Sequence, residues 1–246
     1  MRLARMELLD TAVTFTGNQG LIFGRQSHVG LRGNFGALSF GRQYNPYFLT
    51  LNFADPYATG QVGHSNNLMT TTGSGGRTNN SILYVSPKFS GFGAELLYGF
   101  GEVAGDSSRS RVFNGALSYA GGPLVVRLAH QHQNAATATA AAAKNTILGG
   151  TYDFGLVKLH TAFAVNKGPG STTINAQATG FNLGNGGPYT AVPATPSTDP
   201  RDVLIGATVP VSSGRILTSY IRRNDRTALN QDANQFSIGY EHNLSK

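Results

Sequence analysis

The chain has 246 residues, carries 19 Lys and Arg against 12 Asp and Glu, and contains no cysteine. The missing cysteines exclude disulfides and thiolate metal sites, and the basic residues are spread singly, which argues against a nucleic-acid-binding surface, where they cluster. Charged residues make up only 13% of the chain, and no apolar run reaches the roughly 18 residues that a transmembrane helix needs.

The N-terminal residues, 1–7, contain no apolar stretch of signal-peptide length, so no secretory signal is visible. The pattern over 6–16 weakly indicates the remnant of a strand. From Leu21 onward apolar and polar residues alternate regularly, as in strands that present one face to an apolar medium. The alternation predicts eleven strands, near the length of about 9–11 residues of a tilted membrane strand, over 21–32, 36–44, 80–88, 92–102, 109–120, 122–134, 144–153, 155–165, 201–211, 213–223 and 232–243.

The first two of these strands form a hairpin around the turn 33–36. Val29 and Leu31 share one face of it, whereas His28 and Gly30 share the other. This combination of an apolar and a polar face recurs down the chain. It predicts an all-β, antiparallel transmembrane β-barrel, because a barrel turns its apolar face to lipid and its polar face to water.

The connections between the strands alternate between short and long, which indicates one trimmed rim and one elaborated rim. Outer-membrane barrels have short periplasmic turns and long outer loops, whereas a soluble sandwich has no reason to follow this rule. Gly and Asn in the short turns supply the positive φ angles of tight hairpins. The long connections are 45–79, 103–108, 135–143, 166–200 and 224–231.

Other classes of function remain as alternatives. A secreted or surface-exposed β-rich adhesin without a pore would also be rich in Gly, Ser, Thr and Asn, but it predicts a fixed repeat, and we find none. A barrel enzyme needs a Ser/His pair at one rim, and the sequence places none. The chain has no G-x-S-x-G and no phosphate-binding loop, so we expect no enzyme activity and no cofactor.

Three segments resemble, in order, the general porins of Gram-negative bacteria, and the beta-proteobacterial branch above all. They are the hairpin over 23–44 with its two GRQ ends, NNSILYVSPKFSGF over 79–92, and GYEHNLSK at 239–246. The resemblance implies a single domain over 1–246, an outer-membrane homotrimer of sixteen-stranded barrels, and passive diffusion of small hydrophilic solutes. It also implies that the loop 45–76 folds into the lumen, and that the chain lacks the family's first and last strands.

The resemblance implies that two constriction arginines of the family correspond to Arg25 and Arg77, whereas a third belongs to an early strand that this chain does not contain. The family loop also presents acidic groups across the opening, but between Arg42 and Arg77 the only acid is Asp55. The resemblance therefore implies a pore constriction of Arg25, Arg77 and Asp55, with a mild preference for anions. Its solutes would be small and anionic or neutral.

Strand parity places further residues. Arg127, Lys158 and His160 are predicted to face the lumen and to add positive potential to its wall, although scattered lumenal polarity explains them equally well. Arg42 shares the parity of the lipid-facing strand residues, which predicts a rim position as a loop anchor or a contact to outer-membrane lipid and lipopolysaccharide. His130 and His132 lie on one strand face, but no third ligand is near, so no metal site is predicted.

Overall fold

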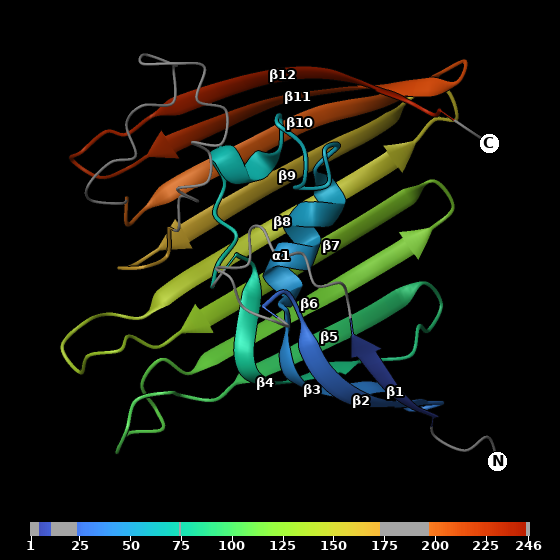
Figure 1. Cartoon of the computed structure of the whole chain (residues 1–246). Helices are drawn as coiled ribbons and strands as arrows, with labels where there is room; N and C mark the ends of the chain where they lie inside the picture. Colours follow the sequence, from blue (N-terminus) through green and yellow to red (C-terminus); the bar gives the residue numbers. More distant parts are fainter. Residues whose placement is uncertain (1–4, 11–23, 74, 173–196, 245–246) are drawn as a thin grey trace.

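The computed structural model describes residues 5–10, 24–73, 75–172 and 197–244. Within them, twelve strands form one antiparallel sheet in chain order, β1 to β12 (Figure 1). The strands are β1 (Arg5–Asp10), β2 (Ser27–Gly33), β3 (Gly36–Tyr44), β4 (Arg77–Val85), β5 (Phe92–Gly99), β6 (Val112–Gly121), β7 (Leu124–Gln133), β8 (Ala143–Asp153), β9 (Lys158–Lys167), β10 (Pro200–Val211), β11 (Gly214–Asp225) and β12 (Ala233–His242).

Tight turns join the strands at one end of the sheet, and longer segments join them at the other. The hairpin of β2 and β3 closes at Gly33 and Gly36, where Gly36 has a φ of 105° and a Cβ atom would lie 2.2 Å from the Val85 carbonyl oxygen. Glycine is therefore required in that turn. The opposite end carries the longer connections, including the one between Tyr44 and Arg77.

The sheet is curved, and its two faces differ in chemistry. The convex face carries large apolar side chains that remain exposed, such as Leu96 (63%), Leu117 (64%) and Ile238 (74%). The concave face carries small and polar side chains, many of them buried, including Asn114, Gln131 and Asn145. Apolar side chains in such a continuous exposed band lack a protein partner, and this arrangement matches the lipid-facing surface of a membrane barrel.

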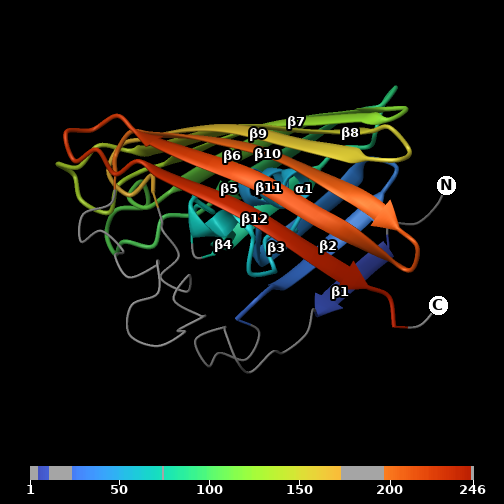
Figure 2. The same ribbon diagram turned by 90° about the horizontal axis from the view of Figure 1, so that it is seen from above.

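A helix, α1 (Pro46–Ala54), lies against the concave face and crosses the direction of the strands (Figures 1 and 2). A short 3-10 helix, η1 (Ser65–Asn67), follows it in the same connection. Among the described residues, β1 pairs with β2 alone and β12 with β11 alone, so the sheet is open along these two strands. No helix of the described residues is long and apolar enough to span a membrane.

All eleven strands predicted from the alternation are present, and the all-β antiparallel class is confirmed. Their ends differ by a few residues. The predicted start of the first strand at 21–23 lies outside the described residues, as do 11–16 of the weakly indicated strand, whereas Arg5–Asp10 is a strand. The helix was not predicted.

Candidate functional site

The connection between β3 and β4 carries the helix that occupies the concave face. Asn45 caps the helix, because its side-chain oxygen accepts a hydrogen bond of 2.8 Å from the backbone N–H of Phe48. Pro46 follows in the first turn, where its missing N–H costs nothing. The side-chain amide of Asn45 also donates to the Thr72 hydroxyl at 3.0 Å. The start of the loop is thus tied to its end.

One side of the helix packs on an apolar patch in the wall. Tyr47, Leu51 and Ala54 are fully buried, and the wall supplies a cluster of small or aliphatic side chains: Ala129, Ile147, Ala162, Ala164 and Leu204. Gly149 lets the helix approach closely, since a Cβ atom there would lie 3.0 Å from the Ala54 Cβ. The patch therefore specifies where the helix rests.

A polar network joins the start of the helix to three wall strands. The Tyr47 hydroxyl donates to the Asn166 side-chain oxygen at 3.2 Å, and burial raises the pKa of Tyr47. Asn166 donates in turn to Asp202 at 3.2 Å, and Arg223 Nε donates to Asp202 at 2.9 Å. Asp202 and Arg223 are almost fully buried, so each charge has the partner that a buried charge requires.

The far part of the loop reaches the last two strands. The Tyr57 hydroxyl donates to the Leu217 carbonyl oxygen at 3.0 Å, and the Gln235 side-chain amide donates to the Gly63 carbonyl oxygen at 2.8 Å. The loop is thereby fastened from β3 to β12 across the concave face.

Asp55 lies at the end of the helix and turns into its own loop. Its carboxylate accepts hydrogen bonds from the backbone N–H groups of Tyr57, Thr59 and Ser65, at 2.9, 3.1 and 2.7 Å. The residue is only 3% exposed. The expectation that Asp55 presents its charge to an opening is therefore wrong. Its charge serves the fold of the loop.

Two arginines meet on one tyrosine beside the helix. Arg25 Nε and Arg77 Nη2 each donate to the Tyr44 hydroxyl at 2.9 Å. The Arg77 guanidinium also lies 4.7 Å from the centre of the Tyr44 ring. The ring of Phe48 of α1 stacks on the same tyrosine, with 4.8 Å between the ring centres. The structure thus brings together the two arginines that lie 52 positions apart in the sequence.

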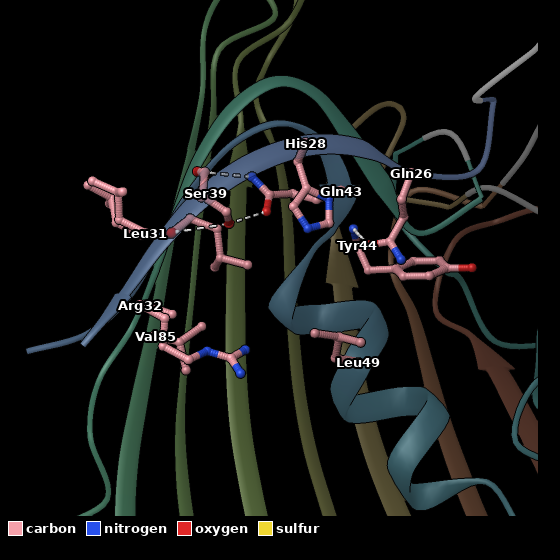
Figure 3. A pocket seen from close by; sticks show the side chains of 13 residues that line it. Gln26, His28, Leu31, Arg32, Ser39, Gln43, Tyr44, Leu49 and Val85 are labelled. Carbon is pink, nitrogen blue, oxygen red and sulfur yellow. Dashed lines mark hydrogen bonds between the residues drawn. The ribbon is translucent and has the colours of Figure 1, made fainter. Parts of the chain in front are cut away.

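A cavity of about 300 Å³ adjoins this arginine pair on the concave face of β2 to β4. Figure 3 shows Gln26, His28, Gln43 and Tyr44 around it, with Leu49 of α1 on the opposite side. Gln43 donates to the Ser81 hydroxyl at 3.2 Å, and the backbone N–H of Tyr44 donates to Gln26 at 3.4 Å. Apolar side chains such as Leu83 and Val85 and the cationic Arg32 also line the cavity, so its surface is largely apolar with a few hydrogen-bonding groups.

Arg42 lies on the other side of its strand from Gln43. Its Nε donates to the Gly24 carbonyl oxygen at 2.9 Å, and its Nη1 donates to the Asn79 side chain. These contacts connect the loop ends that flank β2, β3 and β4. Arg42 is thus held by loop segments and stays outside the contact of Arg25, Tyr44 and Arg77.

The three predicted wall residues lie on the concave face but in different surroundings. Arg127 forms an ion pair of 2.9 Å with Glu95 and contacts the Thr50 hydroxyl of α1 at 3.3 Å. His160 is buried, with its Nε2 3.1 Å from the Thr208 hydroxyl. Lys158 lies opposite Asp153 at the short-turn end. The charge of Arg127 is therefore compensated, whereas Arg25 and Arg77 form no ion pair with any residue that the structure describes.

His130 and His132 point to the convex face. His130 Nδ1 lies 2.8 Å from the Thr146 hydroxyl, and His132 Nε2 lies 3.2 Å from the Asn134 side-chain oxygen. Within the part of the chain that the structure describes, no group of three or more His, Cys, Asp or Glu could hold a metal ion.

Sequence reasoning missed Tyr44, Glu95 and the buried pair of Asp202 and Arg223. The signal for Glu95 was available, because its parity places it on the wet face of β5. Tyr44 and the buried pair depend on how the loop folds back, which spacing along the chain does not reveal.

Comparison with known proteins identifies relatives of the chain. A family model for Gram-negative porins matches residues 3–246. Outer membrane porin protein 32 of Delftia acidovorans is 30% identical over 238 residues, which are 92% of this chain and 61% of that protein. An outer membrane porin protein of Bordetella pertussis is 27% identical. The matched region is 94% of this chain and 66% of that protein.

Solved structures agree with this result. The anion-selective porin from Comamonas acidovorans superimposes with a TM-score of 0.69 at 27% identity, over 90% of this chain and 63% of that one. An OmpF structure from Salmonella typhi has a TM-score of 0.65 at 14% identity, over 89% of this chain and 67% of that one, which shows a shared fold. The chain spans less than two thirds of the length of the two curated porins and of the Comamonas porin.

Proposed function

Because the chain belongs to the Gram-negative porin family, we propose that it forms the wall and the constriction of a passive diffusion channel in the outer membrane. Small hydrophilic solutes cross through the water on its concave side, and the loop 45–76 limits their size. Solutes are selected only by physical properties, and the channel needs no cofactor and no energy source.

The observation that carries the preference for anions is the contact of Arg25 and Arg77 on Tyr44. The contact places two guanidinium groups side by side, and a fixed positive charge in a confined space attracts anions. The carboxylate of the facing loop, Asp55, is turned away from the water. The name of the Comamonas relative, an anion-selective porin, agrees with this proposal.

The proposal has two further parts. The functional unit is a homotrimer, as the family resemblance implies. The solutes are small and anionic or neutral. The alternative of a β-rich adhesin without a pore gains nothing from the family match or from the loop that lies across the concave face, and we do not propose it.

The test is ion selectivity in planar bilayers across a salt gradient. We expect the parent protein to give a reversal potential of the sign for anions. Arg25→Ala with Arg77→Ala should move it toward zero, whereas Arg226→Ala, which removes an exposed loop arginine, should leave it nearly unchanged. A preference for cations in the parent, or a preference for anions that survives the double substitution in full, would contradict the proposal.

A further inference from the structure

The cavity of about 300 Å³ on the concave face of β2 to β4 has a chemistry that the proposed channel does not use. Among the described residues that line it, neither arginine of the Tyr44 pair occurs, and most of the lining is apolar. We call it the side cavity, with its floor at Gly30 and Ser39 and its sides at Leu49, Leu83 and Val85. A channel for inorganic ions needs no apolar hollow beside its charged contact.

The floor of the side cavity lies where small residues of neighbouring strands meet. Gly30 of β2 lies opposite Ser39 of β3, and Ser39 lies opposite Leu83 of β4. A Cβ atom on Gly30 would lie 2.8 Å from the Leu38 carbonyl oxygen, so the close approach of the two strands favours glycine at this position. The hollow is thus built into the register of the wall.

Apolar side chains enclose the space above this floor. Leu83 is buried in a small apolar cluster with Leu97 and Val112, and Val85 packs against the same cluster. Leu49 of α1 lies on the opposite side of the cavity (Figure 3). Small-molecule sites are mostly apolar hollows with a few polar groups that fix orientation. An occupant of the side cavity therefore needs an apolar body.

The end of the side cavity nearest the short turns is positively charged. Arg32 lines the cavity there and lies opposite Ala37, next to the turn that joins β2 and β3. Its guanidinium lies between Val85 and Leu49 in Figure 3. Arg32 is exposed, so a solute in water can reach it, and the described lining contains no Asp or Glu. The charge of the cavity thus matches an anionic group.

The polar groups toward the other end of the cavity are bonded to one another. The Ser39 hydroxyl donates to the Gln43 side-chain oxygen at 2.6 Å, and the Gln43 amide donates to the Ser81 hydroxyl at 3.2 Å. The Gln26 side-chain oxygen accepts from the backbone N–H of Tyr44. A solute with many hydroxyl groups would have to compete with these bonds, and a second carboxylate would lie against apolar side chains at a desolvation cost. The cavity therefore favours a single anionic group.

We propose that the side cavity binds a small monocarboxylic acid with an apolar body. The carboxylate pairs with the Arg32 guanidinium, whose planar fork suits a carboxylate, and the body lies between Leu49 and Leu83. The inference deepens the proposed function and rests on it, because it names a class of solute that the channel retains on its way through. Hydrophilic anions gain nothing from the apolar sides and pass the cavity.

The experiment titrates benzoate into the full-length protein in neutral detergent and follows binding by saturation-transfer difference NMR. We expect saturable binding to the parent. Arg32→Gln should weaken it at least about tenfold, because a charge-assisted hydrogen bond is lost. Lys88→Gln removes an exposed cation from the same end of the sheet and should bind as the parent does.

A second set of variants tests the apolar part of the site. Ala37→Leu fills the cavity next to Arg32 and should abolish binding, and Leu49→Ala removes one side and should weaken it. Ala94→Leu makes the first of these changes on the convex face of β5, where Leu96 is exposed, and is the matched control. If Ala37→Leu loses the circular dichroism of the sheet, the test rests on Leu49→Ala.

Three related solutes separate the features of the occupant. Benzyl alcohol keeps the ring without the charge, acetate keeps the charge without the ring, and succinate adds a second carboxylate, so each should bind at least about tenfold more weakly than benzoate. Benzoate binding that is equal in Arg32→Gln, or in a folded cavity variant, would overturn the proposal, as would any of the three solutes that matches benzoate. Reversal potentials separate the two proposals: a parent that binds benzoate without anion preference contradicts the channel proposal alone, and the opposite result contradicts the side cavity alone.

Discussion

At the scale of single residues, burial decides what a charge does. Asp55 looked like the acid of the opening because it is the only one in its segment, yet its carboxylate satisfies three backbone N–H groups of its own loop. Arg25 is exposed and Arg77 is half-buried, and both donate to the hydroxyl of one tyrosine. The sequence supplies the residue types in both cases, but not the direction in which each side chain turns.

His64 makes the loop sensitive to pH. Burial lowers its pKa below the ordinary histidine value of 6.5, although the nearby Asp55 carboxylate offsets part of the effect. The His64 imidazole thus binds a proton less readily in the folded loop than in the unfolded loop. The stability of the folded loop is therefore fully present above pH 6.5 and falls as the pH drops below the ordinary histidine pKa.

We expect hydrogen exchange in residues 56–67 to become faster as the pH is lowered from about 7.5 to about 5, once the intrinsic pH dependence of exchange is removed. His64→Gln removes the titrating group and should flatten this response. A loop that becomes better protected at low pH, or a response that is the same in His64→Gln, would show that His64 is not the cause.

At the scale of elements, the strands were predictable and the helix was not. A strand with one wet and one apolar face alternates with period two, and this signal survives in β5, β9 and β12. The helix has no such contrast, because Tyr47, Leu51 and their neighbours are apolar around most of its circumference. Asn45 followed by Pro46 was the one local signal of a helix start.

Two neighbouring glycines of β8 test how closely the helix must approach the wall. Gly149 faces the helix, and a Cβ atom there would lie 3.0 Å from the Ala54 Cβ and 3.2 Å from the Thr50 Cγ2. We expect Gly149→Leu to displace α1, to cost about 1–3 kcal/mol, and to change the single-channel conductance.

Gly150 provides the control, because it faces outward and a Cβ atom there would lie no nearer than 3.5 Å to its neighbours. Gly150→Leu should therefore leave the conductance as it is in the parent. Equal conductance in both variants would mean that the position of the helix does not set the width of the opening.

At the scale of the whole molecule, the excess of seven positive charges is distributed unevenly. Several ion pairs neutralise charges within the wall, among them Arg127 with Glu95 and Arg223 with Asp202. Among the described residues, Arg25 and Arg77 at Tyr44 form no ion pair. Net charge alone pointed to anions as partners, but it could not locate this pair, because the pair depends on how the loop folds back.

Salt should reduce the selectivity of the proposed channel. The Debye length falls from about 10 Å at about 0.1 M to about 3 Å at about 1 M, so the field of Arg25 and Arg77 reaches less of the opening. We expect the ratio of anion to cation permeability, from reversal potentials, to decline toward one over this range. A ratio that does not change with salt would point to selection by size in place of charge.

The loop that crosses the concave face also constrains the order in which the molecule can assemble. Its contacts join residues far apart in the chain, with Tyr57 bonded to Leu217 and Gln235 to Gly63. Such contacts close long stretches of chain, and their entropic cost is met only when the intervening strands are already paired. The loop can therefore dock only after β11 and β12 have joined the sheet. The segment that crosses the concave face is then the last part to settle, and the molecule passes through a stage in which the strands are paired and their concave face is still bare.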